Sequence, residues 1–318
     1  MQEREWELEG GSLKYKIQDG AVCIVEFHGQ TAELTVPEQI EGLPVAVIGK
    51  KAFLSRKSLR LVRLPGTVRE IGDWAFASCS GLKEIQLPRR ELCFGKAVFL
   101  DCTRLERIVL YGEASPCGAG EPEGQGNTLQ TAELLAAAVK DFGAYYLLEP
   151  PAVGSPEWLG KWDAKLAAVL HTPDEEGFSR QVLCGEEDYG STDVLAYVSE
   201  RRREKARLAF LRLLYPWKLA EPQKCELEAY LKAHTKGCGS EETWQVILRE
   251  KGNDRAYYSL FAELGGLNAE NLCPILEDIG EEFPEMKAYF LQRMAQAPAA
   301  TDFFAGLELS NLADPGKF

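Results

Sequence analysis

Histidine and methionine are scarce in this chain, which holds three of each among 318 residues. The histidines, His28, His171 and His234, do not form an H-E-x-x-H or H-x-x-x-H pattern, so metal catalysis has no support. The chain also lacks the G-x-S-x-G nucleophile motif and the G-x-x-x-x-G-K-S/T phosphate loop. We therefore predict no catalytic residue, no metal site and no cofactor.

Long apolar runs are absent as well. No stretch approaches the roughly 18 consecutive apolar residues of a transmembrane helix, so the sequence predicts no membrane insertion. The N-terminus, MQEREWELEGG, lacks the basic start and apolar run of a secretory signal. Nine cysteines are scattered without C-x-x-C spacing, which favours reduced thiols over disulfides or zinc. We expect a cytoplasmic protein, or a cell-surface one if this chain is trimmed from a secreted precursor.

Charge and composition change along the chain. The net charge is -13, yet residues 1–110 hold 16 basic and 15 acidic side chains, leaving 20 basic and 34 acidic for the remainder. The first third is rich in Val, Ile and Gly, and the rest in Ala, Leu, Glu and Lys. Residues 112–127 contain five Gly, two Pro and no large apolar side chain, which is typical of a flexible linker. We therefore predict domains at 1–111 and 128–318.

An internal repeat dominates the first domain. The segments IGKKAF, IGDWAF and FGKAVF begin at Ile48, Ile71 and Phe94, so the step is 23 residues both times. Four columns are identical in all three copies: Gly49, Gly72, Gly95; Phe53, Phe76, Phe99; Leu59, Leu82, Leu105; and Leu64, Leu87, Leu110. A unit with apolar residues on one side only cannot cover them alone, so successive units are expected to stack over a continuous core. The glycine column suits a tight turn or a close backbone approach.

The repeat resembles a known family. A 23-residue unit with an I-G-x-x-A-F signature is similar to the BspA-like leucine-rich repeats of bacteria, over residues from about 12 to 111. The segment before the first full unit resembles that family's N-terminal region through Pro37, Ile40, Gly42, Pro44 and Val45. The resemblance implies a leucine-rich-repeat solenoid. It also implies an adhesin-type role, because the family is often associated with cell-surface proteins that bind host or matrix components.

Exposed positions on the repeat strands predict a binding surface. Each unit holds an L-x-x-V/I-x-L strand whose x positions point away from the core, because side chains alternate along a strand. If the stack curves as leucine-rich repeats do, these residues line the concave face. They form three columns: Arg60, Lys83, Glu106; Leu61, Glu84, Arg107; and Arg63, Gln86, Val109.

Residues 50–69 carry seven basic side chains and no acidic one. One interpretation is a solvated edge, and the other is a patch for an acidic partner. Nucleic acid is disfavoured as a partner, because the positive charge is local and the protein is acidic overall. Cys79 and Cys102 share one repeat column, where we expect small, half-buried turn residues.

Beyond residue 127 the apolar period changes to about 3.6, which predicts helices. A helix capped by Ser155 carries Trp158 and Trp162 on its apolar stripe, and a long helix runs from about Asp193 to Tyr215. The charged middle of that long helix, ERRREKAR, is expected to be solvated. Further helices are predicted near 129–142, 222–235, 241–251, 254–264, 269–279, 284–296 and 302–312.

Short helices with short loops suggest antiparallel pairs, and residues 241–268 weakly resemble a terminal ankyrin-type unit. We expect Trp158, Trp162 and Trp244 to be core anchors. The predicted fold is thus α+β, with a leucine-rich-repeat solenoid followed by an all-α, helical-repeat-like domain.

Three functional hypotheses follow. The first is a non-catalytic module that binds a protein partner through the repeat face and the helical domain. The second is a cell-surface adhesin-type protein, and the third is an enzyme with its site in the helical domain, beside His171 or His234. The sequence leaves the identity of the partner and the oligomeric state open.

Overall fold

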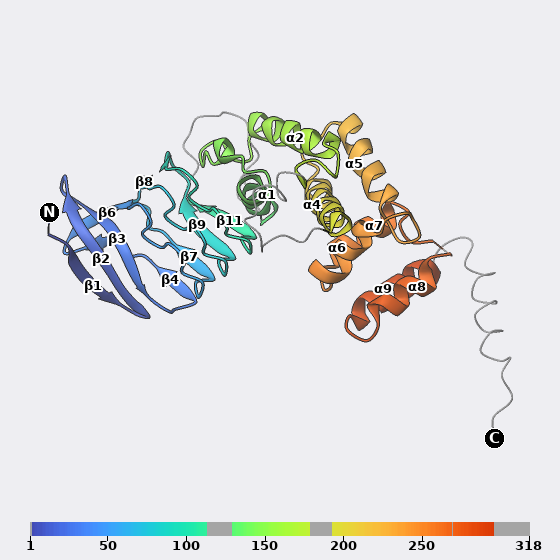
Figure 1. Cartoon of the computed structure of the whole chain (residues 1–318), viewed down its shortest axis with the longest axis horizontal. Helices are drawn as coiled ribbons and strands as arrows, with labels where there is room; N and C mark the ends of the chain where they lie inside the picture. The colour runs from blue at the N-terminus through green and yellow to red at the C-terminus, as the bar shows by residue number, and fades with distance from the viewer. Residues whose placement is uncertain (1, 113–128, 179–192, 269, 296–318) are drawn as a thin grey trace, which may run out of the picture. The chain divides into compact units, whose positions relative to one another are not determined.

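The structure, a computed structural model, describes residues 2–112, 129–178, 193–268 and 270–295 (Figure 1). The chain divides into two compact units, Met1–Val169 and Leu170–Phe318. The first unit contains a β-solenoid and the first helices, and the second is helical in its described residues. This arrangement confirms the predicted α+β fold class.

The solenoid has two sheets, which we call sheet A and sheet B. Sheet B is parallel and has the order β11-β9-β7-β4, formed by β4 (Glu33–Thr35), β7 (Leu61–Arg63), β9 (Glu84–Pro88) and β11 (Arg107–Tyr111). Sheet A has the order β1-β2-β3-β6-β8-β10 and consists of β1 (Arg4–Leu8), β2 (Gly11–Gln18), β3 (Ala21–Gly29), β6 (Leu43–Ile48), β8 (Glu70–Ile71) and β10 (Cys93–Phe94). The short strand β5 (Gln39–Ile40) pairs with β6.

A stack of phenylalanine rings fills the core of the solenoid. The ring centroids of Phe53 and Phe76 lie 4.8 Å apart, and those of Phe76 and Phe99 lie 5.7 Å apart. Phe27 extends the stack by one turn, at 5.7 Å from Phe53. All four rings are buried. The predicted continuous core is confirmed, with one more turn than the repeat signature marks.

The close approach of successive turns of the backbone requires glycine in the glycine column. A Cβ atom on Gly72 would lie 2.8 Å from the backbone nitrogen of Lys50, and one on Gly95 would lie 2.4 Å from that of Asp73. Left-handed backbone occurs instead in two other repeat columns, both of non-glycine residues: Lys51, Trp74 and Ala97 with φ of 60°, 53° and 51°, and Ser55, Ser78 and Asp101 with φ of 59°, 57° and 57°. The repeat therefore reproduces backbone conformation even where its residue types differ.

Cys79 and Cys102 are more deeply placed than predicted. They are 0% and 2% exposed, so the expectation of half-buried residues is wrong. The Cys79 thiol donates to the carbonyl of Phe53 at 3.0 Å, and the Cys102 thiol donates to that of Phe76 at 3.1 Å. Each thiol thus joins its own turn to the preceding one, which requires the side chain to lie inside the stack.

Helices follow the solenoid within the first unit. Helix α1 (Leu129–Lys140) packs against β11, the last strand of sheet B. Two tryptophans of α2 (Pro156–His171) secure this layer: Trp162 Nε1 donates to the Leu134 carbonyl at 2.9 Å, and Trp158 Nε1 donates to the carbonyl of Leu147 in the short helix η1 (Tyr145–Leu147) at 2.8 Å. Both indole side chains are buried, as predicted for core anchors.

The predicted domain limits stay a prediction. Residues 113–128, which contain nearly all of the predicted linker at 112–127, lie outside the described residues. The compact first unit extends to Val169, because α1 packs on β11 and contacts η1, and the tryptophans of α2 bond to η1 and α1.

In the second unit, α4 (Val194–Leu214) packs against the three helices that follow it. The described helices after α4 are α5 (Glu221–Ala233), α6 (Glu242–Glu250), α7 (Arg255–Glu263), α8 (Leu272–Ile279) and α9 (Pro284–Ala295). Trp244 is fully buried and lies 5.5 Å from Phe261 and 6.4 Å from Phe290, between ring centroids. These helices agree with the predicted ones to within a few residues, and the predicted helix at 302–312 lies outside the described residues.

The charged middle of α4 is only partly solvated, which corrects the prediction. Lys205 is only 3% exposed and donates to the Thr172 carbonyl and to Asp174 Oδ1, both at 2.6 Å. Arg202 Nε donates to Asp174 Oδ2 at 2.7 Å. We call Asp174, Arg202 and Lys205 the Asp174 clamp. It anchors the loop after α2 to α4, a tertiary role that the local charge pattern does not reveal.

Candidate functional site

The predicted binding residues lie together on the solvent side of sheet B. Strand pairing places the members of two columns directly opposite one another, and the buried residues Val62, Ile85 and Ile108 alternate with them. The remaining column precedes the strands at the same repeat position. We call this set the sheet B face: Arg60, Lys83, Glu106; Leu61, Glu84, Arg107; and Arg63, Gln86, Val109.

The charges near β9 and β11 on this face are neutralised internally. Arg107 Nε donates to Glu84 Oε2 at 2.8 Å, and the Gln86 amide donates to Glu84 Oε1 at 2.8 Å. Lys83 and Glu106 lie 3.8 Å apart as a more exposed ion pair. This part of the face presents a hydrogen-bonded polar surface with little net charge.

Arg63 on β7 differs, because it faces an aromatic ring instead of a carboxylate. Its guanidinium lies 4.9 Å from the centre of the Tyr111 ring. Tyr111 is fixed in turn, because its hydroxyl donates to the Leu64 carbonyl. Burial raises the pKa of Tyr111 above its ordinary value of 10.0, against the opposing effect of the Arg63 charge. Arg63 is thus a cation held in place by stacking.

The seven basic residues at 50–69 do not act as one patch. Arg60 Nη1 donates to the carbonyl of Lys57 at 2.7 Å, so its guanidinium binds its own turn. Arg56 pairs with Glu26 at 3.1 Å. Lys50 and Lys51 lie over the Trp74 ring, at 5.0 and 5.7 Å from its centre. Both interpretations of the segment therefore stay predictions, and Arg63 is its exposed cation on the sheet B face.

Two features that adjoin the sheet B face, strand β4 and Tyr111, were not predicted from the sequence. Strand β4 extends the sheet beyond β7 and adds the exposed side chains of Glu33 and Thr35. Its buried Leu34 pairs with Val62, which is 28 residues later, so a search for a 23-residue step misses it. Tyr111 stands at the repeat position that Pro65 and Pro88 occupy in the first two copies, and this departure from proline is the signal that the sequence offers.

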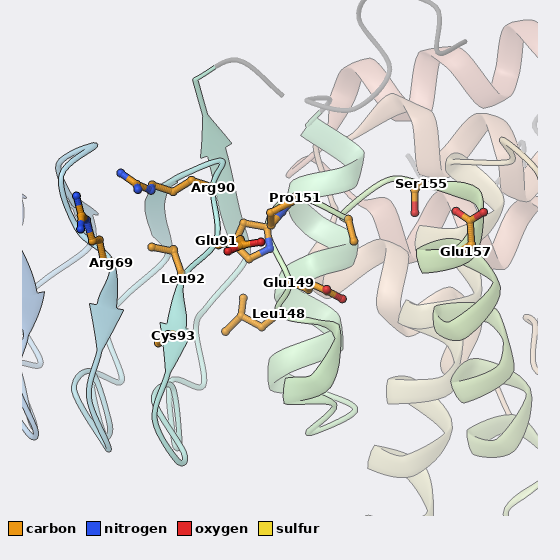
Figure 2. A pocket seen from close by; sticks show the side chains of 12 residues that line it. Arg69, Arg90, Glu91, Leu92, Cys93, Leu148, Glu149, Pro151, Ser155 and Glu157 are labelled. Carbon is orange, nitrogen blue, oxygen red and sulfur yellow. The ribbon is translucent and has the colours of Figure 1, made fainter. Parts of the chain in front are cut away.

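A groove lies beside sheet A, where β10 is opposite the segment Leu148–Ala152. We call it the β10 groove, and its volume is about 900 Å³. Figure 2 shows Arg69 and Arg90 on one side of it, with Glu149 and Glu157 on the other. Sequence reasoning missed this groove, because one wall comes from the repeat and the other from the helical segment that follows it.

The histidines do not assemble into a catalytic group. His28 lies 3.1 Å from Glu26, and His171 lies 2.7 Å from Glu226 with 71% of its side chain exposed. His234 stacks on Tyr230, with ring centroids 4.3 Å apart. Within the described ranges, no three His, Cys, Asp or Glu side chains are grouped to hold a metal ion.

None of the described helices is both long enough and apolar enough to cross a bilayer.

Comparisons with known proteins agree with this architecture. A profile of the BspA type leucine rich repeat region matches residues 30–119, with six copies. Leucine-rich repeats of this type are generally non-enzymatic. A search of curated proteins finds no match.

Several solved structures of bacterial leucine-rich repeat proteins are similar. The leucine-rich repeat protein of T. pallidum is 30% identical over 32% of this chain and 48% of its own, with a TM-score of 0.26. A leucine-rich cell surface protein from Faecalibacterium prausnitzii A2-165 is 24% identical over 34% of this chain and 30% of its own, with a TM-score of 0.29. A leucine-rich repeat protein from Bacteroides ovatus is 23% identical over 33% of this chain and 29% of its own, with a TM-score of 0.29.

The chain thus spans about half of the T. pallidum protein and less than a third of the other two. The repeat step, the stacked phenylalanine core and the profile match all concern the same part of the chain. Residues 30–119 are a BspA-type leucine-rich repeat region.

Proposed function

We propose that this protein is a non-catalytic module that binds a partner protein through the sheet B face, with the helical unit as a second contact surface. The observation that carries the proposal is the in-register array of outward side chains on β7, β9 and β11. Such a face offers fixed hydrogen-bonding groups without any reactive constellation. Polar and charged groups arranged in this way give specificity for a complementary surface.

Arg63 indicates which chemical group the partner should present to the sheet B face. It is exposed, stacked on Tyr111 and free of a carboxylate partner in the described residues, whereas Arg107 is neutralised by Glu84. A partner with an acidic group opposite β7 would complete this part of the face. Because the stacked guanidinium is already ordered, little conformational entropy is lost when it binds.

A photo-crosslinking amino acid at Gln86 tests the face directly. We expect it to capture a discrete partner in lysate of the source organism, and Arg63→Glu to abolish that capture. Lys96→Glu is the matched control, because Lys96 is an exposed cation in the turn after β10. Equal capture by both charge-reversal variants would refute the role of the face, provided that both melt like the original protein.

An adhesin-type role is the second candidate, and the family profile favours it because BspA-like proteins are often found at the cell surface. An adhesin would use the same sheet B face, but it would act at the cell surface instead of inside the cell. Protease treatment of intact cells separates the two: an adhesin is cleaved, while an intracellular module is cleaved only after lysis.

A further inference from the structure

The last described strand of sheet A has an open edge. The amide of Cys93 in β10 donates to the Arg69 carbonyl at 2.8 Å, and the amide of Gly95 donates to the Ile71 carbonyl at 2.7 Å. Backbone polar groups of successive strand residues point to opposite sides, so those of Phe94 point away from β8. Among the described residues, no strand pairs with that side of β10. An edge of this kind is a template for another extended chain.

The segment opposite β10 is unsuited to fill this edge itself. Figure 2 shows Leu148, Glu149 and Pro151 on the open side of β10. Pro150 and Pro151 lack the N–H group that a pairing strand would donate. The intervening β10 groove holds about 900 Å³, within the range of roughly 300–1,000 Å³ found for binding pockets. That size suits a few residues of extended chain, which advances about 3.3 Å per residue.

The two sides of the groove differ in charge, because Arg69 and Arg90 outnumber Glu91 on the repeat side while Glu149 and Glu157 line the other. Arg69 and Arg90 are exposed, and neither has an ion-pair partner in the described part of the chain. Arg90 makes one hydrogen bond, to the Gly66 carbonyl at 3.1 Å. Glu149 and Glu157 are also exposed and lack a cationic partner among the described residues. An occupant should therefore carry both charges, separated along its length.

We propose that the β10 groove binds an extended peptide segment of a partner protein by strand addition to β10. The segment pairs its backbone with that of Phe94. It places an acidic side chain near Arg69 and Arg90, and a basic side chain near Glu149 and Glu157. Main-chain pairing supplies affinity in this mode of recognition, and the flanking charges supply specificity.

A small free anion fits these observations less well. It could contact the two guanidinium groups, but it would leave the backbone of Phe94 unpaired and would be repelled by Glu149 and Glu157. The peptide accounts for the edge, the prolines and both charge clusters together.

Fluorescence polarisation with the full chain and synthetic peptides tests the proposal. The probes are blocked hexapeptides of alternating Thr and Val with Asp near one end and Lys near the other, made in both orders, and a neutral version with Ser at both places. We expect one charged order to bind about tenfold or more tighter than the neutral peptide. Arg69→Glu/Arg90→Glu should remove that preference. The control is Lys57→Glu/Arg104→Glu, which changes the net charge by the same amount at exposed positions outside the groove. This variant should retain the preference for the charged peptide.

Backbone N-methylation of the preferred peptide tests the strand pairing separately. Loss of binding on methylation supports strand addition, and unchanged binding overturns it. The proposal also fails if the neutral peptide binds equally well, or if millimolar inorganic phosphate alone displaces the peptide completely. Because Arg63→Glu alters the sheet B face and not the groove, it should leave peptide binding unchanged, so the two proposals can fail independently.

Discussion

At the scale of single residues, the thiols of Cys79 and Cys102 serve as internal hydrogen-bond donors. Burial raises the pKa of Cys79 from its ordinary 9.0 to about 11, and that of Cys102 to about 12. The folded state therefore favours the protonated thiols. Their contribution to stability is complete below pH 9.0 and is lost as the pH rises through about 11 to 12. At neutral pH both are structural groups, because the thiolate is the reactive form.

Thiol labelling should separate the cysteines into two classes. A chromogenic disulfide reagent at pH 8 should react quickly with the four exposed thiols and with the three buried ones only after unfolding. The exposed set is Cys93, Cys225, Cys238 and Cys273, and the buried set is Cys23, Cys79 and Cys102. Replacing Cys117 and Cys184, which lie outside the described residues, with serine makes the count unambiguous. Rapid labelling of Cys79 in the folded protein would contradict the hydrogen-bonded column.

The Asp174 clamp makes a second prediction at this scale. Burial by itself would raise the pKa of Asp174, but hydrogen bonds from Lys205 and Arg202 outweigh it and hold that pKa below 3.8. The clamp therefore stabilises the second unit fully above pH 3.8, and this contribution is lost as the pH falls through the lowered value. Asp174→Asn leaves Lys205 buried without its countercharge, which should cost about 3–5 kcal/mol.

Urea unfolding at pH 7 measures this loss. Glu200→Gln is the control, because Glu200 pairs with Arg203 and Arg207 but leaves 54% of its side chain exposed. Exposed ion pairs contribute roughly 0–1 kcal/mol. If the two variants unfold at the same urea concentration, the clamp is not a buried electrostatic anchor.

At the scale of elements, the sequence predicts the strands and helices that follow a periodic pattern. It misses the features that no such pattern marks. The 23-residue step locates β7, β9 and β11, because identical columns can stack only in one register. Apolar periodicity locates α4 to α9, because each helix buries one stripe. Strand β4 is missed because its spacing is irregular, and the β10 groove because its walls are distant in sequence. The depth of Lys205 depends on Asp174, which no local pattern connects to it.

The phenylalanine stack gives the first prediction for an element. Phe76 lies between two other rings and is fully buried. Phe76→Ala should therefore lower the free energy of unfolding by about 3–5 kcal/mol, the usual effect of removing a core aromatic ring. Calorimetry of the full chain checks this value, and an unchanged melting profile would contradict the contribution of stacking to the fold.

The left-handed columns give a second prediction. Ala97 adopts a φ of 51°, a conformation that glycine tolerates better than alanine. Ala97→Gly should therefore raise the stability by about 0.5–1 kcal/mol, although glycine usually destabilises regular structure. Ala75 is buried and is not among the residues with positive φ, so Ala75→Gly should have the opposite effect. A loss of stability in both variants would show that the left-handed turn stores no strain.

At the scale of the whole molecule, the first unit combines two proposed binding surfaces on one compact core. Helix α1 packs on β11 and so covers the last edge of sheet B, while the edge of sheet A at β10 meets a groove. A stacked repeat array needs such end covers, because its terminal unit would otherwise expose its apolar face. The helices after the repeat therefore complete the solenoid as well as leading to the second unit.

This argument predicts where the chain can be divided. A fragment ending at Val169 retains α1, whose Leu134 and Leu135 are fully buried, and should be monomeric and melt cooperatively. A fragment ending at Gly112 exposes the edge of β11 and the apolar surface beneath α1, so it should self-associate. Light scattering and thermal melting of both fragments decide between the two boundaries. If the shorter fragment is monomeric and equally stable, the domain ends near the predicted linker and α1 is not part of the solenoid's folding unit.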